Sequence, residues 1–430
     1  MSMTTIVALA TPPGVSALAV VRISGLAAQD ICKAILPSFD MKPRVASLTK
    51  AVAFKHEANM GHEIDKLIAI YFPAPNSHTG EDVLELFPHG NPFIIRKLLE
   101  SICKVPNVRL AELGEFTELA FLNGKIDLTQ AEALGDLLSA SNSKTLANAQ
   151  RLLTGEVSAE IKALAEKIKE ISASMELEVD FAEDIGTSPL QEGCPKGGVS
   201  LHNVLNNLQG LKKRFKKNSN ELPRVVFFGA PNAGKSTLIN ALVSEDRLLV
   251  SEVPGTTRDF VEVPLHLPGG DILLTDTAGL ASEAQSDIDR QAMQKTYEVL
   301  EKANLKILVA DISVDLPAEF EEWKKIADLT METHLDLQNR PAPSPAQLIQ
   351  TLNDIFFPKE ESEETWITSE RQIACIKKAE ECVKRALESN AIETAAFEMR
   401  EARNALCSIT GEISDENILD EIFSNYCIGK

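Results

Sequence analysis

The chain has 430 residues, of which 44% are hydrophobic and 25% are charged, the balance of an ordinary folded protein. This length exceeds what one hydrophobic core usually supports, so two or three domains are expected. The formal net charge of -20 argues against a broad electrostatic surface for nucleic acid, so any RNA contact is expected to be local or made by a partner.

Targeting signals are not recognisable in the sequence. The start, MSMTTIVALATPPG, lacks a basic segment followed by an uninterrupted apolar one, and no later apolar run approaches membrane-spanning length. The seven cysteines form no CxxC pair, so reduced thiols are expected. These features predict a soluble, cytoplasmic protein without membrane contact.

Residues 1–120 predict an N-terminal α+β domain, because short apolar runs alternate with turn residues: IVALA before TPPG, ALAVVRI before SG, and KLIAIYF before PAPN. Residues 121–220 predict the first part of a helical domain. Thr129 and Glu132 have capping-box spacing, and apolar residues recur at helical spacing from Ile161 to Val179.

The basic run KKRFKKN, residues 212–218, closes this helical stretch. Cations at a helix C-terminus complement the helix dipole, so a solvated helix end is the favoured interpretation. Contact with phosphates is the alternative.

Residues 221–358 predict an α/β nucleotide domain. The strand RVVFF leads into the loop GAPNAGKS and the helix TLINALV, and the strands DILLTD and LKILVAD follow. Strands that alternate with helices indicate a mostly parallel sheet. Residues 359–430 are again helical in pattern, so the nucleotide domain lies between two helical segments.

A phosphate-binding loop is the strongest chemical signal. GAPNAGKS, residues 229–236, matches GxxxxGKS directly after a strand and before a helix. Backbone N–H groups of such a loop surround phosphates, while Lys235 reaches the β- and γ-phosphates and Ser236 ligates Mg²⁺. The residues assigned to nucleotide binding here are Asn232, Ala233, Gly234, Lys235, Ser236 and Thr237.

Two further motifs follow in the order that a switch GTPase requires. PGTTRD offers the hydroxyls of Thr256 and Thr257 to the metal and the γ-phosphate. DTAG places Asp276 toward Mg²⁺ and the N–H of Gly279 toward the γ-phosphate. The three motifs together predict a GTPase rather than a P-loop ATPase or kinase.

Over nearly its whole length the sequence resembles the bacterial MnmE family of tRNA modification GTPases. The matching stretches are TIVALATPPG, VRISG, SHTGEDVLEL, GEFTELAFLNGKIDLTQAEAL, VDFAEDI, GAPNAGKSTLINAL, PGTTRD, DTAGL and ITGEISDENILDEIFSNYCIGK. The resemblance implies an α/β multidomain fold with an N-terminal α+β folate-binding-like domain, an α-helical domain and an inserted Ras-like P-loop G domain.

The same resemblance implies a function in modifying carbon 5 of the wobble uridine, U34, of certain tRNAs. A tetrahydrofolate derivative would donate one carbon, and the chain would form a homodimer and a heterotetramer with the FAD-containing protein MnmG, which would make most tRNA contact. Asn232 would ligate K⁺ beside the Mg²⁺ held by Ser236 and Thr257. That potassium ion adds positive charge to the transition state, and turnover accompanies G-domain dimerisation.

Candidate residues of the folate pocket and the modification site follow from the matching motifs. Those for the folate pocket are Arg22, Gly80, Glu81, Glu85, Lys125 and Lys430, and Cys427 matches the family's terminal cysteine. Solvated turn residues and a buried, unreactive cysteine are the alternatives.

The sequence departs from the family pattern in two catalytic or ligand-binding regions. ELGEFT and ELAFL stand where the family has RPGEFT and ERAFL, so two arginines are missing. Asp289 falls where a catalytic glutamate is expected, with Glu283 as the alternative, and misplacing such a group by about 1 Å costs on the order of 100-fold in rate. A nucleotide-binding scaffold that hydrolyses poorly is therefore the alternative function.

The guanine-selecting motif NKxD is missing from the sequence. Thr333 to Asp336, THLD, is the nearest match, and coincidence is the alternative. The preceding residues lack a β-branched run, so a strand supporting this loop is doubtful, and a SAK-type loop is at most a remnant near Ser344. Weakened but surviving selectivity for GTP is expected.

Overall fold

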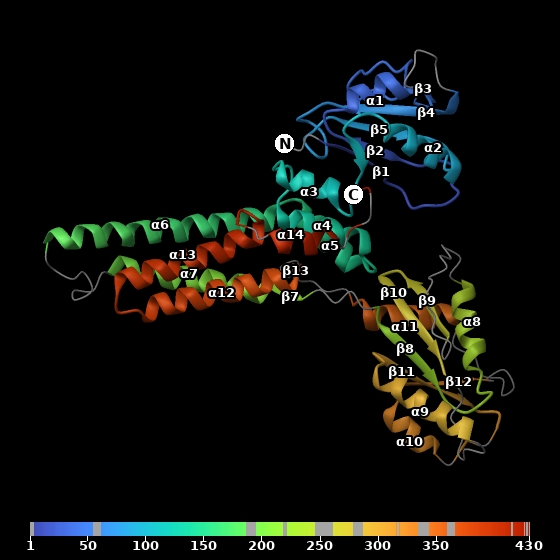
Figure 1. Ribbon diagram of the computed structural model, residues 1–430. Coiled ribbons are helices and arrows are strands. Elements are labelled where there is room, and N and C mark those ends of the chain that lie inside the picture. The colour runs from blue at the N-terminus through green and yellow to red at the C-terminus, as the bar shows by residue number, and fades with distance from the viewer. Residues whose placement is uncertain are drawn as a thin grey trace. The chain divides into compact units, whose positions relative to one another are not determined.

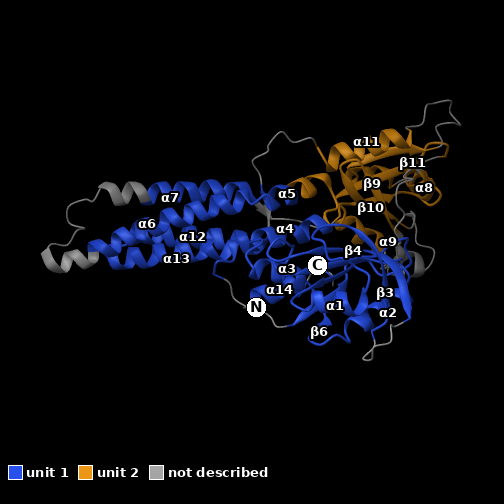
Figure 2. Cartoon of the chain, turned by 90° about the horizontal axis from the view of Figure 1, so that it is seen from above, with its two compact units in different colours: residues 1–138, 149–217, 366–430 blue, residues 139–148, 218–365 orange. Residues whose placement is uncertain are grey.

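The computed structural model describes residues 4–54, 62–185, 195–217, 222–245, 261–277, 287–314, 316–317, 319–333, 344–358, 366–413, 416–424, 426 and 429. The chain forms two compact units, one of residues 1–138, 149–217 and 366–430 and the other of residues 139–148 and 218–365 (Figure 2). No helix in the described ranges is both long and apolar enough to cross a membrane.

The first unit begins with a six-stranded sheet in the order β3-β4-β5-β2-β1-β6, antiparallel except for the β1–β6 pair. The strands are β1 (Thr5–Leu9), β2 (Val21–Ser24), β3 (Ser47–Val52), β4 (Glu63–Phe72), β5 (Val83–Phe87) and β6 (Val108–Leu110). Helices α1 (Ala28–Ile35) and α2 (Pro92–Ile102) share a buried core with the sheet (Figure 1).

The opposite face of this sheet carries the N-terminal ligand candidates. Because side chains alternate along a strand, Val7 of β1 joins the core under α1 and α2, whereas Ile6 and Ala8 pack with Phe116 of α3 (Glu115–Leu122). Arg22 of β2 pairs in register with Glu85 of β5. The sheet thereby brings together two sequence motifs that lie more than 60 residues apart.

A helical bundle completes the first unit. Its core comes mainly from α6 (Glu156–Ile185), α7 (Pro195–Arg214), α12 (Glu370–Glu388) and α13 (Ile392–Thr410), which lie side by side in Figure 1. Two short strands, β7 (Phe215–Lys217) and β13 (Trp366–Thr368), pair in parallel where the chain leaves and re-enters this unit.

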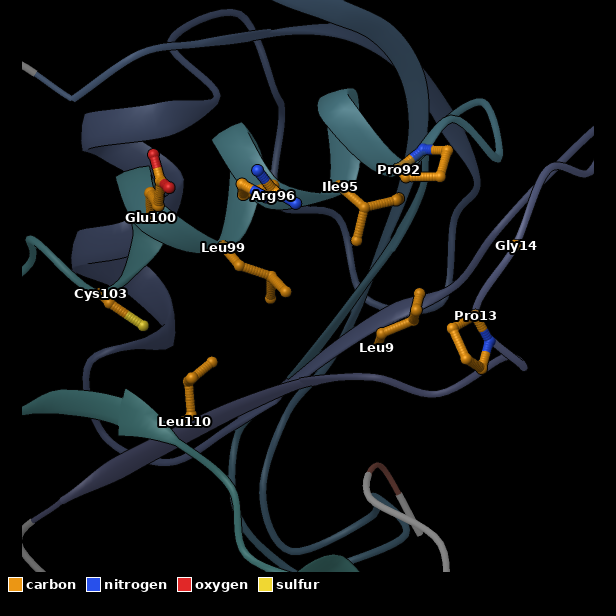
Figure 3. A pocket seen from close by; sticks show the side chains of 10 residues that line it. All are labelled: Leu9, Pro13, Gly14, Pro92, Ile95, Arg96, Leu99, Glu100, Cys103 and Leu110. Atoms are coloured by element: carbon orange, nitrogen blue, oxygen red, sulfur yellow. The ribbon is translucent and has the colours of Figure 1, made fainter.

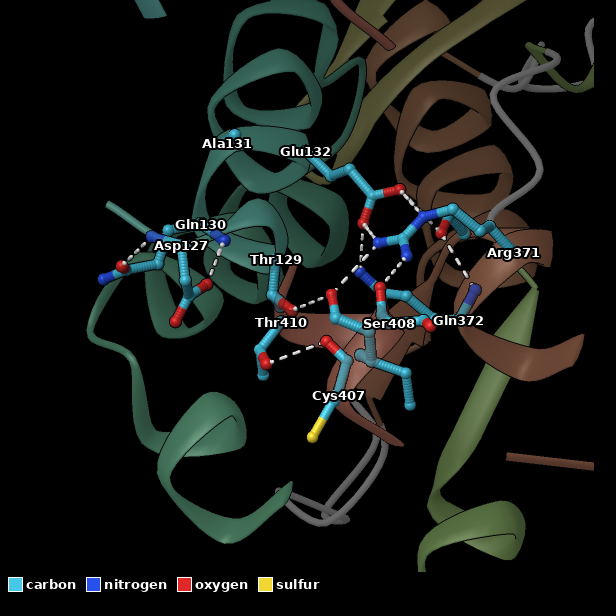
Figure 4. A network of polar contacts seen from close by, with 12 residues as sticks. Asp127, Thr129, Gln130, Ala131, Glu132, Arg371, Gln372, Cys407, Ser408 and Thr410 are labelled. Atoms are coloured by element: carbon cyan, nitrogen blue, oxygen red, sulfur yellow. Dashed lines mark hydrogen bonds and ion pairs between the residues drawn. The ribbon is translucent and has the colours of Figure 1, made fainter. Parts of the chain in front are cut away.

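A polar network joins the two helical segments, which are separated in sequence (Figure 4). Glu132 of α4 (Leu128–Ser139) accepts hydrogen bonds from Arg371 and Gln372 at the start of α12. Arg371 also donates to the carbonyl of Ser408 at 2.6 Å, near the end of α13. The network therefore links α4, the start of α12 and the end of α13, after which α14 (Glu416–Ser424) follows in the chain.

The second unit holds a five-stranded sheet in the order β12-β11-β8-β10-β9, parallel except for β9. Its elements are β8 (Arg224–Phe228), α8 (Lys235–Glu245), β9 (Val261–Leu267), β10 (Gly270–Asp276), α9 (Asp287–Glu301), β11 (Leu305–Asp311), α10 (Phe320–Ile326), β12 (Leu329–Thr333) and α11 (Pro345–Phe356). Helices α8 and α11 share one core with the sheet, and α9 and α10 share another.

Residues 139–148, which include the start of α5 (Ser143–Leu153), belong to this second unit. They bind the turn between β9 and β10: Asp271 N–H donates to the Ser141 carbonyl at 2.7 Å, and Ser143 N–H donates to the Gly269 carbonyl at 2.8 Å. The helical pattern of the sequence did not predict this assignment.

Candidate functional site

The phosphate loop joins β8 to α8 with the backbone that its sequence requires. A Cβ atom on Gly229 would lie 2.2 Å from the carbonyl oxygen of Val309, so only glycine fits against β11. Asn232 and Gly234 have φ values of 58° and 89°, in the left-handed region that asparagine and glycine tolerate best. The loop therefore has the backbone of a phosphate-binding turn and leads directly into the N-terminus of α8.

Lys235 is held against this loop. Only 6% of the residue is exposed, and its ammonium donates hydrogen bonds to the carbonyl oxygens of Ala230 at 2.9 Å and Gly229 at 3.3 Å. Burial lowers the pKa of Lys235, and the negative charge of Asp276 partly offsets that effect. A phosphate group would replace weak carbonyl acceptors with an anionic one.

Ser236 and Asp276 form the candidate metal site. Asp276 ends β10, one strand away from the loop in the sheet, and its Oδ2 accepts a hydrogen bond of 2.5 Å from the Ser236 hydroxyl. Its Oδ1 is buried and has no hydrogen-bond partner in the described part of the chain. A hydroxyl and a carboxylate oxygen of this kind fit the oxygen ligands that Mg²⁺ prefers.

Thr333 lies beside the same loop, at the end of β12. Its hydroxyl is 2.8 Å from the carbonyl oxygen of Ala233. The doubt about a strand before Thr333 was wrong, because β12 pairs in parallel with β11 from Leu329 to Thr333. Pairing within the sheet outweighs a low intrinsic strand preference. Ser344, in contrast, forms a capping box with Gln347 at the start of α11.

Some of the other predicted nucleotide-site residues lie in the described part of the chain, and the rest lie outside it. Asn232 and Thr237 are exposed, on the loop and on the first turn of α8. Asp289 lies in the first turn of α9, and its side chain is not described. The candidates outside the described residues are Thr256, Thr257, Gly279, Glu283, Asp336, Cys427 and Lys430.

Four of the N-terminal candidates form two contacting pairs, Arg22 with Glu85 and Gly80 with Lys125. The Arg22 Nε atom donates to Glu85 Oε1 at 2.9 Å, and Arg22 Nη1 donates to the carbonyl of Gly429 at 3.3 Å. Gly80 has a φ of 80°, and a Cβ there would lie 2.9 Å from Cε of Lys125. The structure thus brings the Arg22–Glu85 pair close to the C-terminal tail, and Gly80 close to Lys125.

The loop of residues 77–81 is fixed against β2 by hydroxyl contacts. The Ser24 hydroxyl lies 2.6 Å from the Thr79 hydroxyl and 2.9 Å from Glu81 Oε2. The same loop contains His78, which sequence reasoning did not single out although it lies within the motif SHTGED. Desolvation lowers the pKa of His78, the charge of Arg22 lowers it further, and Glu85 opposes the shift.

A separate cavity of about 460 Å³ lies between α2, β1 and β6 (Figure 3). Its lining is mostly apolar and includes Leu9, Ile95, Leu99 and Leu110, with Arg96, Glu100 and Cys103 as its polar and sulfur-bearing members. None of the predicted folate residues in the described part of the chain is among its lining residues. The cavity beside α2 is therefore mostly apolar, whereas the predicted folate residues around Arg22 and Glu85 are charged.

Basic residues at the end of α7 form ion pairs with carboxylates of the same unit. Lys212 pairs with the buried Glu380 at 2.6 Å, and Arg214 pairs with Glu160 at 2.8 Å. Arg214 also lies 5.8 Å from the ring of Trp366. These contacts favour the interpretation of a helix end over that of a phosphate-binding surface.

Comparison with known proteins covers the whole chain. The family model described as "GTP-binding protein TrmE N-terminus" matches residues 5–125, and the model described as "MnmE helical domain" matches residues 128–427. Among solved structures, the G domain of the T. maritima FeoB iron transporter matches 31% of this chain and 84% of that chain, with 27% identity and a TM-score of 0.21.

Curated relatives match from end to end. The tRNA modification GTPase MnmE of Aquifex aeolicus is 36% identical over 456 residues, with 99% of both chains covered. Proteins of the same name from Coxiella burnetii and Proteus mirabilis are 34% and 32% identical, with at least 98% of each chain covered. The predicted fold class, an N-terminal α+β domain, a helical domain and an inserted Ras-like G domain, is confirmed.

Proposed function

The chain belongs to the MnmE family of tRNA modification GTPases, and we propose that it hydrolyses GTP at the loop of residues 229–236 during modification of carbon 5 of U34. The observation that carries this proposal is the phosphate loop, where the buried ammonium of Lys235 lies beside the Ser236–Asp276 pair. Asp276 Oδ1 is buried there without a partner among the described residues.

The arrangement suits a magnesium-bound triphosphate. Ser236 and Asp276 would hold the ion, which supplies positive charge that neutralises the phosphates. Lys235 is close enough to exchange its two carbonyl acceptors for phosphate oxygens. Loop N–H groups and the N-terminus of α8 add fixed positive dipoles at the same point.

We further propose that hydrolysis depends on potassium, bound with the help of Asn232, and accompanies dimerisation of the nucleotide domains. Asn232 is exposed, and its backbone is left-handed, with a φ of 58°. GTP turnover should be several-fold faster in KCl than in NaCl at equal ionic strength. The variant Asn232→Gly, which tolerates the left-handed backbone of this position, should lose that difference and still bind GDP, whereas equal wild-type rates in both salts would contradict the potassium requirement.

The face formed by Arg22, Glu85, Gly80 and Lys125 is proposed to bind a tetrahydrofolate derivative in a homodimer. Its two cations suit the anionic glutamate tail of a folate. Calorimetry of the full-length protein with 5-formyltetrahydrofolate should show binding that Arg22→Gln and Lys125→Gln each weaken. The exposed Lys33→Gln is the matched control. Absence of heat with the wild type, together with a monomeric mass by light scattering, would remove both parts of this proposal.

Contact with tRNA is proposed to occur mainly through MnmG, because the net charge of -20 leaves little positive surface. Co-elution of the two proteins, and modification of tRNA by the pair and not by either alone, would support this assembly. The same turnover assay addresses the scaffold alternative. Tight GTP binding with no turnover in either salt would favour a non-hydrolysing subunit.

A further inference from the structure

The turn between β9 and β10 is bound by the short segment that leads into α5. The Asp271 N–H donates a hydrogen bond to the Ser141 carbonyl at 2.7 Å. The N–H and the hydroxyl of Ser143 both donate to the Gly269 carbonyl, at 2.8 Å and 3.0 Å. The partners of the last bond are 126 residues apart in the sequence, so this is a tertiary contact and not a local turn.

Glycine at position 270 permits this close approach. Asn142 and Gly270 pair as an antiparallel bridge, and a Cβ atom on Gly270 would lie 2.3 Å from the Cβ atom of Asn142. The φ of Gly270 is 153°, a value that residues with a side chain rarely adopt. Residues 141–143 and 269–271 therefore fit closely against each other, and we name these two segments the clasp.

The strands beyond the clasp lead to the nucleotide motifs. Strand β10 runs from Gly270 to Asp276, whose carboxylate accepts the hydrogen bond from Ser236 at the candidate metal site. Strand β9 begins at Val261, shortly after the motif PGTTRD, and its register pairs Val261 with Asp276. One hairpin therefore has the clasp at its turn and the metal-site carboxylate at its open end.

Helix α5 continues from the clasp. The Asn142 side chain accepts a hydrogen bond of 2.7 Å from the Thr145 N–H, so Asn142 belongs both to the clasp and to the first turn of the helix. The helix ends in the first unit, where the guanidinium of Arg151 lies 4.1 Å from the ring centre of Trp366. Side-chain contacts thus hold α5 near both of its ends.

We propose that the clasp couples the nucleotide site to α5: magnesium–nucleotide binding at Asp276 and closure of the clasp stabilise each other. Both events order the same hairpin, and a hairpin that one of them has ordered costs less for the other to bind. Such coupling is reciprocal and typically changes affinity by about 5- to 150-fold. The inference rests on the proposed binding of GTP to residues 229–236.

Two substitutions at Ser143 open the clasp by different amounts. Ser143→Pro removes both donors to the Gly269 carbonyl, and α5 is retained because proline suits the first position of a helix. Ser143→Ala removes only the hydroxyl. In the full-length protein, Ser143→Pro should weaken binding of GDP with Mg²⁺ by about fivefold, the lower end of typical coupling, and Ser143→Ala by less than about twofold.

A substitution on the other side of the clasp provides an independent variant. Gly270→Ala places a methyl group against Asn142 and should weaken GDP binding by a similar factor, about fivefold. Gly14→Ala is the matched control, because Gly14 has a φ of 147° and its Cβ atom would meet nothing within 4 Å. It reproduces the backbone strain without the collision and should bind GDP like the wild type.

Amide hydrogen exchange of the full-length protein measures closure of the clasp directly. The Ser143 N–H lies in the first turn of α5, where an N–H has no partner within the helix, so its protection reports the bond to Gly269. Saturating GDP with Mg²⁺ should slow its exchange about fivefold, because reciprocal coupling requires the same factor as the affinity loss. The Asp328 N–H, bonded to the Lys306 carbonyl, is the reference amide in the same unit.

The expected result is slower exchange at Ser143 than at the reference amide when GDP is added, together with weaker GDP binding in Ser143→Pro. Equal slowing at both amides would reflect general stabilisation and would overturn the coupling. Unchanged GDP affinity in Ser143→Pro would overturn it as well. Absence of GDP and GTP binding by the wild type is a distinct outcome, which would refute the proposed function and the coupling with it.

Discussion

Two clusters of charged groups in this protein differ in how completely they bond to each other. In the helical network, both carboxylate oxygens of Glu132 accept hydrogen bonds, and Arg371 donates to Glu132 and to the carbonyls of Ser408 and Ile409. In the nucleotide unit, one buried carboxylate oxygen of Asp276 has no hydrogen-bond partner among the described residues. Within the same residues, the Lys235 ammonium donates hydrogen bonds to backbone carbonyls alone.

This difference indicates that the Glu132–Arg371 network stabilises the fold, whereas Asp276 and Lys235 are available to bind a ligand. Charged groups that satisfy one another hold elements together, and removing either partner leaves a costly unpaired charge. Groups that keep an unused bonding position lower their energy when a ligand arrives. Changes in the helical network should therefore alter folding stability, whereas changes near the phosphate loop should alter affinity.

The largest effect is expected from Glu132→Leu. It leaves the guanidinium of Arg371, 18% exposed, without its carboxylate, which should lower the free energy of unfolding of the first unit by about 3 kcal/mol. Urea unfolding measures this, and the double variant Glu132→Leu/Arg371→Leu should recover part of the loss. The exposed pair of Glu166 with Lys169 is the control, since Glu166→Leu should cost less than about 1 kcal/mol.

The GDP affinity of Glu132→Leu tests whether the helical network and the phosphate loop are independent. Glu132→Leu should bind GDP like the wild type, because no ligand group is lost. A GDP affinity that falls together with the unfolding free energy would show that the helical network and the phosphate loop are not independent.

A smaller but more specific effect is expected from Lys235→Ala. The loop loses its cation against the phosphates, so affinity for GTP should fall by at least about 100-fold, or roughly 2.7 kcal/mol. Unfolding stability should change less than affinity, because the described bonds of the ammonium go to backbone carbonyls and not to a charged side chain. The exposed Lys324→Ala on α10 is the control. GTP binding of near wild-type strength in Lys235→Ala would place the nucleotide elsewhere.

The phosphate loop was predictable because its chemistry is local. Eight consecutive residues specify the turn, the cation and the hydroxyl, and the neighbouring strand and helix confirm them. The bond from Thr333 to Ala233 was not predictable, since it spans 100 residues. Strand β12 was also missed, because residues of Leu329–Thr333 alternate between partly buried and exposed, and pairing with β11 stabilises the strand.

The contacts of Arg22 with Glu85 and Gly429 were not predictable from local sequence patterns. Arg22 and Gly429 are 407 residues apart, and no spacing rule connects them. Only resemblance to a family grouped these residues in the sequence, whereas in the structure the register of β2 with β5 and the tail near Arg22 bring them together. His78 went unnoticed because a single histidine in a turn carries no pattern, and its surroundings appear only when the loop lies against β2.

The smallest expected effect concerns pH. Burial lowers the pKa of Lys235 below its ordinary value of 10.5 in the free protein. Bound phosphates favour the charged ammonium and so raise this pKa in the complex. Between the two values, nucleotide binding takes up a proton, and affinity should fall as pH rises through that interval. Each unit of difference between the two pKa values limits the change to about tenfold.

Calorimetry of GDP binding between pH 7 and pH 10, in buffers with different ionisation enthalpies, counts the protons taken up. Lys235→Arg is the matched variant, because a guanidinium stays charged throughout this range and should bind with little proton uptake. Uptake that appears at alkaline pH in the wild type and disappears in Lys235→Arg assigns it to this residue. Affinity that is constant or rises with pH would contradict the argument, because a buried lysine that gains an anionic partner must bind that partner more weakly once it is deprotonated.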